Sequence, residues 1–134
     1  MRNLTYDEAK AEYEERIDYQ SGKYAGVGLE NNTRLVECGN DYAVRLHRTD
    51  IVTLREDGDI VLRTGGWKTR TTKQRLNKYA PTGHIFQEDG RWYISTDNEV
   101  LLWSEATDIV RGPGIRLRPD GRVRERVERE PAMA

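Results

Sequence analysis

The segment from Arg63 to Ala80 reads RTGGWKTRTTKQRLNKYA and interrupts a chain that otherwise consists of short alternating strands and turns. No acidic residue occurs between Asp59 and Glu88. Within this gap the segment supplies six basic side chains, those of Arg63, Lys68, Arg70, Lys73, Arg75 and Lys78. The segment therefore predicts a basic element placed between two groups of strands.

A short helix is expected after Gly65-Gly66, where the strand-like alternation of apolar side chains stops. Thr71 or Thr72 can cap its N-terminus, and Pro81 ends it after Tyr79. Helical spacing gives it an inward and an outward face, formed by Leu76 and Tyr79 and by Arg75, Lys78 and, as a further candidate, Lys73.

A capping box opens the chain: the Thr5 hydroxyl can accept from the Glu8 amide while the Glu8 side chain reaches back. Apolar side chains then recur at helical spacing, which predicts a helix from Tyr6 to Tyr19. The opposite face is acidic and consists of Glu8, Glu12, Glu15 and Asp18. This helix either packs on the sheet with a solvated outer face or presents that face to a partner.

Three Asp-Gly turns predict three β-hairpins, at Glu56-Asp57-Gly58, Glu88-Asp89-Gly90 and Pro119-Asp120-Gly121. A two-residue loop would pair Leu117 with Arg124 and mix the two faces, whereas a three-residue loop pairs Leu117 with Val123. The same three-residue loop predicts further pairs, namely Leu54 with Ile60, Val52 with Leu62, Arg55 with Asp59, and Phe86 with Trp92.

The fold class predicted for residues 1–134 is α+β, as a single domain. A strongly twisted, mainly antiparallel sheet of about six to eight strands would carry the N-terminal helix and the short helix near 71–79. Further strands are expected at 33–38, 42–47, 84–87, 91–95 and 100–103. The tail from Arg122 either continues as a strand or forms a frayed helix, and residues 1–4 and 128–134 are expected to be flexible.

Composition limits the class of protein. The formal net charge is −1, with 34% charged and 36% hydrophobic residues, so the core is small and any preference for a partner must come from local clusters. The single cysteine, Cys38, excludes an internal disulfide and suits a reducing compartment. The chain shows no secretion signal and no membrane-spanning apolar run, which predicts a cytoplasmic protein without a membrane partner.

Two basic clusters are candidate sites for an anion or for nucleic acid. The first combines a helix start, hydroxyl donors, cations and an indole that can stack on a base, and consists of Trp67, Lys68, Arg70, Thr71, Thr72, Lys73, Arg75 and Lys78, with Thr69 as a further donor. The alternative is a covering helix whose cations are solvated or balance the acidic first helix.

The second cluster is the last hairpin, where the predicted register sets Arg116 opposite Arg124 and Arg118 opposite Arg122. Four arginines on one face would suit a phosphate backbone or an acidic surface. The alternative is local neutralisation by Asp120, Glu125 and Glu128.

Catalytic and metal patterns are missing from the sequence. Cys38, His47 and His84 match no zinc spacing, and no phosphate loop or nucleophile motif occurs, so we predict no cofactor, no metal and no enzyme activity. A metal-dependent nuclease is the remaining alternative, built on Asp50, Glu56, Asp57 and Asp59. Hairpin turns favour acidic residues in any case.

The stretch from Tyr42 to Asn77 resembles a pattern in small uncharacterised proteins of tailed bacteriophages and related mobile elements. Its distinctive part is Gly65-Gly66-Trp67 followed by TTK-x-R-L-N at 71–77. The resemblance implies a phage origin and expression in the cytoplasm of a bacterial host.

Two functional hypotheses follow. The first is a non-enzymatic phage accessory protein that contacts the phosphates of DNA or RNA. The second is a protein that binds and inhibits a host defence protein, as anti-CRISPR proteins do, through the acidic first helix and aromatic anchors. Tyr93 and Trp103 are either such anchors or core residues. The oligomeric state stays open.

Overall fold

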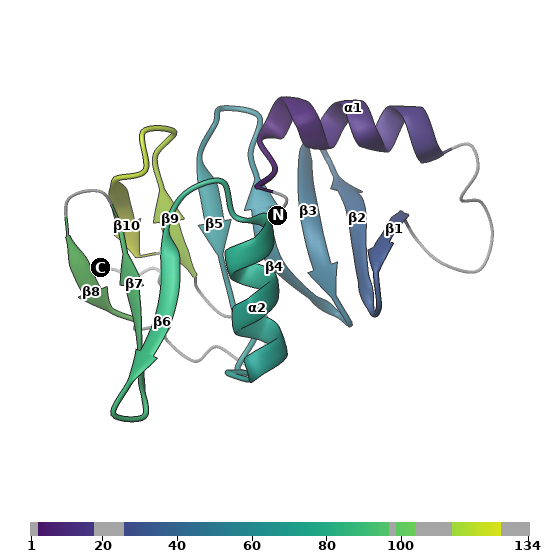
Figure 1. The fold of residues 1–134 in the computed structure, drawn as a ribbon. Coiled ribbons are helices and arrows are strands. Elements are labelled where there is room, and N and C mark those ends of the chain that lie inside the picture. Colours follow the sequence, from purple (N-terminus) through teal and green to yellow (C-terminus); the bar gives the residue numbers. More distant parts are fainter. Residues whose placement is uncertain (1–2, 18–25, 97–98, 104–113, 127–134) are drawn as a thin grey trace, which may run out of the picture.

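A computed structural model describes residues 3–17, 26–96, 99–103 and 114–126 of the chain (Figure 1). Its elements are α1 (Tyr6–Arg16), β1 (Val27–Glu30), β2 (Thr33–Cys38), β3 (Asp41–Leu46), β4 (Thr49–Leu54), β5 (Ile60–Leu62), α2 (Arg70–Tyr79), β6 (His84–Glu88), β7 (Arg91–Ser95), β8 (Val100–Leu102), β9 (Ile115–Leu117) and β10 (Val123–Arg126). The α+β class is confirmed, with both helices where they were expected.

The strands form two antiparallel sheets, not the one sheet that we predicted. Seven strands follow the order β1-β2-β3-β4-β5-β9-β10, and β6-β7-β8 form a second sheet. The chain leaves the large sheet after β5, builds α2 and the small sheet, and returns as β9 beside β5 (Figure 1). Both sheets contribute to one hydrophobic core, which includes Leu62 and Leu117 from the large sheet and Ile85 and Ile94 from the small one.

Helix α1 begins with the predicted capping box. The Thr5 hydroxyl accepts from the Glu8 amide at 3.2 Å, and the Thr5 amide donates to the Glu8 carboxylate at 3.0 Å. The helix lies against β2 and β3 (Figure 1) and buries Ala9, while the rings of Tyr6 and Tyr13 pack on Tyr42. The described helix ends at Arg16, and the predicted continuation over 18–19 lies outside the described residues.

Helix α2 packs against β3 and β4 of the large sheet and against β6 of the small one. Leu76 and Tyr79 are buried, as their spacing predicted. The cap was predicted at Thr71 or Thr72 but is Thr69, whose hydroxyl accepts from the Thr72 amide at 3.1 Å. Leu4 is buried beside the other end, where its amide donates to the Tyr79 carbonyl at 3.0 Å.

Two of the three predicted hairpin registers are confirmed. Leu54 pairs with Ile60, Val52 with Leu62, and Leu117 with Val123. The glycines of both loops, Gly58 and Gly121, have φ near +90°, as a three-residue loop requires. The amide of Arg55 donates to the Asp59 carbonyl at 2.9 Å, which also confirms that pair.

The register predicted for the β6–β7 hairpin is wrong. Phe86 pairs with Tyr93, and Trp92 pairs with Gln87. Asp89 and Gly90 both have positive φ, of 53° and 78°, which is the type I′ geometry of a two-residue loop. This register brings Trp92 to the face that also buries Ile85 and Ile94.

The predicted pairing of Arg116 with Arg124 is also wrong. A bulge between Val123 and Glu125 shifts the register, so that Glu125 lies opposite Arg116. Arg118 does face Arg122, whose carbonyl accepts from the Arg118 amide at 2.7 Å. The tail continues as strand β10, one of the two forms expected, and residues 127–134 lie outside the described part of the chain.

Candidate nucleic-acid interface

Strand direction places the two predicted basic clusters at opposite edges of the large sheet. β4 and β5 form an antiparallel hairpin, so the residues before β4 and after β5 share one edge. We call this the basic edge; it comprises the β3–β4 turn (His47 and Arg48), Trp67 to Thr69, and the first turn of α2 (Arg70 and Thr71). The β4–β5 and β9–β10 turns lie at the other edge, where Gly58 approaches Pro119.

A hollow of about 540 Å³ opens at the basic edge. It is lined by the end of β3, the start of β4 and the start of α2, and its lining includes Leu46, Arg48, Ile51, Trp67 and Thr71. Trp67 is 67% exposed at the rim, although an indole of this size is normally buried at least in part. The volume falls in the range of ligand sites in proteins, about 300–1,000 Å³.

Three exposed cations lie at the basic edge, and one of them, Arg48, lines this hollow. Lys68 and Arg70 lie beside the N-terminus of α2, and Arg48 lies in the β3–β4 turn. None of the three forms an ion pair within the described part of the chain. Because the first amides of a helix have no intrahelical acceptor, those of Arg70 and Thr71 add partial positive charge at the same place.

Two other predicted residues serve the structure of this edge. Thr72 is buried at the base of the hollow, and its hydroxyl lies 3.0 Å from that of Thr69, so it completes the cap. Lys73 is half-buried: its Nζ donates to the Gln87 side chain at 3.3 Å and lies 6.0 Å from the centre of the Trp92 ring.

Arg75 and Lys78, which we predicted to project outward, instead form ion pairs with Glu30 in β1. The distances to the Glu30 carboxylate are 2.8 Å for Lys78 Nζ and 3.5 Å for Arg75 Nη2. The Tyr79 hydroxyl donates to the same carboxylate. Hydrogen bonds from Lys78 and Tyr79 therefore hold the pKa of Glu30 below its ordinary value, although burial opposes this. These cations are balanced by β1 rather than by the acidic first helix.

Replacing Glu30 with glutamine is expected to destabilise the protein by about 1–2 kcal/mol at pH 7, since charge-assisted hydrogen bonds would be lost. A lowered pKa in the folded state gives stability that is present above the unfolded-state value of about 4.5 and is lost as pH falls through the folded-state pKa. Urea unfolding should therefore separate wild type from Glu30→Gln at pH 7 and show a smaller gap near pH 3. Glu15→Gln on the exposed side of α1 is the control; a gap that stays constant with pH would contradict the expectation.

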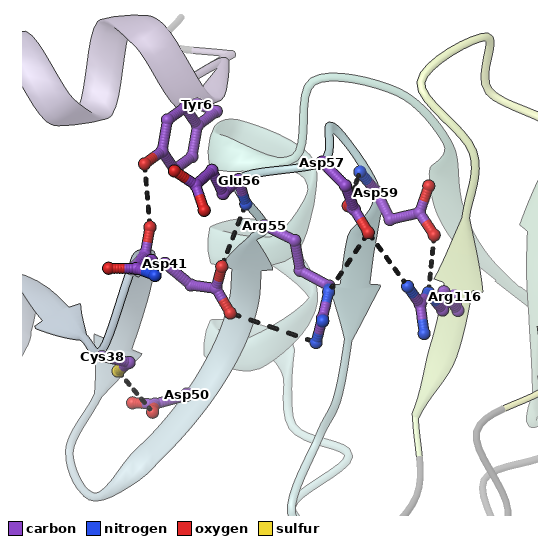
Figure 2. Close-up of polar contacts among 10 residues, drawn as sticks. Tyr6, Cys38, Asp41, Asp50, Arg55, Glu56, Asp57, Asp59 and Arg116 are labelled. Carbon is purple, nitrogen blue, oxygen red and sulfur yellow. Dashed lines mark hydrogen bonds and ion pairs between the residues drawn. The ribbon is translucent and has the colours of Figure 1, made fainter.

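The second predicted cluster is divided among different environments at the other edge, shown in Figure 2. Arg116 Nε lies 2.6 Å from Asp59 and its Nη2 lies 3.4 Å from Asp57, while Arg55 bridges Asp57 and Asp41 at 3.8 and 4.0 Å. Arg116 thus belongs to a row in which acidic and basic side chains of this chain alternate, namely Asp41, Arg55, Asp57, Arg116 and Asp59. Arg118 and Arg122 are exposed, with Arg122 3.9 Å from Asp120. The side chain of Arg124 lies outside the described residues.

The carboxylates of the nuclease alternative do not gather into one site. Asp50 lies near the start of β4 and pairs with Arg45 at 2.6 Å, while Asp57 and Asp59 follow the end of that strand (Figure 2). Asp50 also lies 3.7 Å from Cys38, and burial together with this carboxylate raises the pKa of the Cys38 thiol. Among the residues that the structure describes, no three acidic, histidine or cysteine side chains are grouped as metal ligands.

The sequence-based prediction missed His47 and Arg48 as part of this site. The signal was available in the strand pattern, because two strands joined by a short hairpin bring the preceding and following residues to one edge. His47 has a positive φ of 56°, which marks the tight turn that carries Arg48. Trp103, weighed as an exposed anchor, is buried at 3% exposure, whereas Tyr93 is half-buried.

Residues 11–111 match the protein family described as Kyanoviridae Gp96 protein. The chain belongs to this family. The match covers more than half of the chain and confirms the phage origin that the Gly65-Gly66-Trp67 pattern implied, while the pattern itself stays a prediction. No curated protein and no solved structure matches the chain. Within the described residues, neither helix has the length and apolar character that crossing a membrane would require.

Proposed function

We propose that this phage protein is a non-enzymatic accessory protein that binds the phosphates of DNA or RNA at its basic edge. The observation that carries the proposal is a hollow lined by an exposed indole, Trp67, and an exposed cation, Arg48, with two further exposed cations, Lys68 and Arg70, next to its lining residues in the chain. Cations and helix-start amides suit phosphate oxygens, and an indole suits the face of a base.

The ion pairs within the chain reduce the number of basic residues on which the proposal depends. Arg75, Lys78 and Arg116 are held by carboxylates of this chain, so their charges are locally balanced. Arg118 and Arg122 are exposed at the opposite edge and could contact phosphates only on a separate surface. The basic edge is therefore the surface on which we base the function.

Titration of fluorescently labelled DNA and RNA with the intact protein tests this proposal. We expect binding at about 50 mM salt that weakens steeply toward about 200 mM, because phosphate neutralisation releases condensed counterions. Absence of binding to every nucleic acid at the lower salt concentration would reject the proposal. Addition of EDTA should leave binding unchanged and the nucleic acid intact; cleavage that requires a divalent metal would point to the nuclease alternative.

A second function, inhibition of a host protein, is favoured by the outward face of the small sheet. The rings of His84, Phe86 and Tyr93 form a stacked row there, and Val100 and Leu102 are exposed on the adjacent edge strand. Grouped apolar side chains on a surface are typical of protein-binding sites. A stoichiometric protein partner that is captured from host lysate, resists nuclease treatment and is lost with Val100→Glu would support this function over nucleic-acid binding.

A further inference from the structure

A second hollow, of about 400 Å³, is bordered by Lys68, the residue that follows Trp67. It is formed between the segment that carries Trp67 and the β6–β7 turn, and its lining includes Lys68, Arg91, Trp92, Leu102 and Trp103. Trp67 and Thr69 line the first hollow, whereas Lys68 lines the second. The stretch 67–69 therefore borders both hollows, and we call it the ridge.

Both hollows combine aromatic surface with positive charge. No carboxylate occurs among the described residues that line them, while Arg48, Lys68 and Arg91 supply three cations. Lys73 lies against the face of Trp92 and adds charge behind the second hollow. The nearest carboxylates of the small sheet are at the β6–β7 turn, where Glu88 pairs in register with Arg91. This charge arrangement is complementary to a polyanion that carries flat apolar groups.

We propose that the basic edge binds single-stranded nucleic acid, with bases in the two hollows and the backbone crossing the ridge at Lys68. The inference rests on the proposed function and specifies its ligand. In a duplex, the base faces are stacked on one another and cannot reach an indole, whereas a single strand exposes them. Trp67 then stacks on a base entering the first hollow. The cations at Arg48, Lys68 and Arg91 follow the phosphates from one hollow to the other.

The test compares a labelled single strand with the duplex of the same sequence at the same salt concentration. Separate arms use an oligo(dT) and an oligo(rU) probe to distinguish DNA from RNA. We expect at least tenfold tighter binding to single strands, and weaker binding when the strand is too short to reach both hollows. We also expect quenching of tryptophan fluorescence, because Trp67 is the exposed member of the three tryptophans.

Two variants connect the result to the hollows. Trp67→Ala should weaken single-strand binding about tenfold and abolish most of the quenching, since stacking on an aromatic ring contributes about this much per base. Arg91→Gln should weaken the binding of long single-stranded oligonucleotides more than that of short ones. Arg122→Gln, at the opposite edge, is the matched control for the loss of one charge. Because Trp67 is exposed, thermal unfolding should be unchanged and any loss of binding is local.

The outcomes separate the two levels of the proposal. If duplex binds as tightly as single strand and Trp67→Ala has no effect, the single-strand inference is overturned, while phosphate binding at this edge survives. If no nucleic acid binds at all, both the inference and the proposed function are rejected.

Discussion

Replacing Arg116 with leucine is expected to lower the free energy of unfolding by about 3 kcal/mol. The Asp59 carboxylate is only 2% exposed, and Arg116 Nε approaches it at 2.6 Å (Figure 2). Removing one partner of a buried ion pair leaves a desolvated charge behind, which typically costs about 3–5 kcal/mol. We take the lower value because the Arg116 side chain is 28% exposed, so that water can partly replace it.

This ion pair also has a topological role. Asp59 follows the β4–β5 turn, and Arg116 lies on β9, the strand that re-enters the sheet after the excursion through α2 and the small sheet. The pair therefore adds a charged contact to a junction that, among the described residues, has three backbone residue pairs, Ile60–Leu117, Val61–Arg116 and Leu62–Ile115. Loss of the pair should loosen β9 and β10 before it affects β2 to β4.

Chemical denaturation followed by circular dichroism measures this effect, with hydrogen exchange to locate it. The double variant Asp59→Asn/Arg116→Leu should recover much of the lost stability, because it removes the charge that the single variant leaves buried. Asp57→Asn, which removes the more exposed partner of Arg116, should cost less than about 1 kcal/mol. If Arg116→Leu and Asp57→Asn were equally mild, the pair would not hold this junction.

The elements that the sequence predicted well are those whose information is local. The capping box from Thr5 to Glu8, a motif of four residues, defines the start of α1. The helical spacing of Leu76 and Tyr79 alone identifies the buried face of α2. Gly65-Gly66, both of which adopt positive φ, marked the change from strand to helix, although the cap is Thr69 and not Thr71 or Thr72. None of these features depends on a distant part of the chain.

The two Glu-Asp-Gly turns show where local information ends. Glu56-Asp57-Gly58 forms a three-residue loop, whereas the identical tripeptide at 88–90 forms a two-residue loop. The residues that follow make the difference. The buried Asp59 pairs with Arg116, 57 residues away, whereas the exposed Arg91 forms no ion pair with any residue that the structure describes. Burial of Trp92 therefore sets the second register. Tertiary contacts therefore decide which loop length and register each of these identical turn sequences adopts.

The candidate site shows the same limit. Trp67, Lys68 and Arg70 stand out in the sequence, but nothing local indicates that Glu30 in β1 holds Arg75 and Lys78, more than forty residues further along the chain. The hollows are formed by the β3–β4 turn and the β6–β7 hairpin, which approach Trp67 to Thr69 only in the folded chain. Charge density along the sequence thus identified the region but overestimated how many of its cations are available.

Neutralising the three exposed cations of the basic edge should have the largest effect on binding. The triple variant Arg48→Gln/Lys68→Gln/Arg70→Gln is expected to bind nucleic acid at least a hundredfold more weakly at about 50 mM salt. Each lost phosphate contact should also reduce the slope of log affinity against log salt by about one, so the slope should fall by about three. Titrations at several salt concentrations give both quantities. Since these side chains are exposed and form no ion pair within the described residues, stability should change little.

The matched control removes three exposed cations at the opposite edge and on α1, in the variant Lys10→Gln/Arg118→Gln/Arg122→Gln. Both triple variants shift the formal net charge from −1 by the same three units, so a difference between them reports position and not total charge. We expect the control to bind within about threefold of wild type and to keep its salt slope. Equal weakening in both variants would mean that overall charge governs binding. A larger loss in the control would assign the phosphates to the β9–β10 hairpin, because Arg118 and Arg122 are exposed cations of that hairpin.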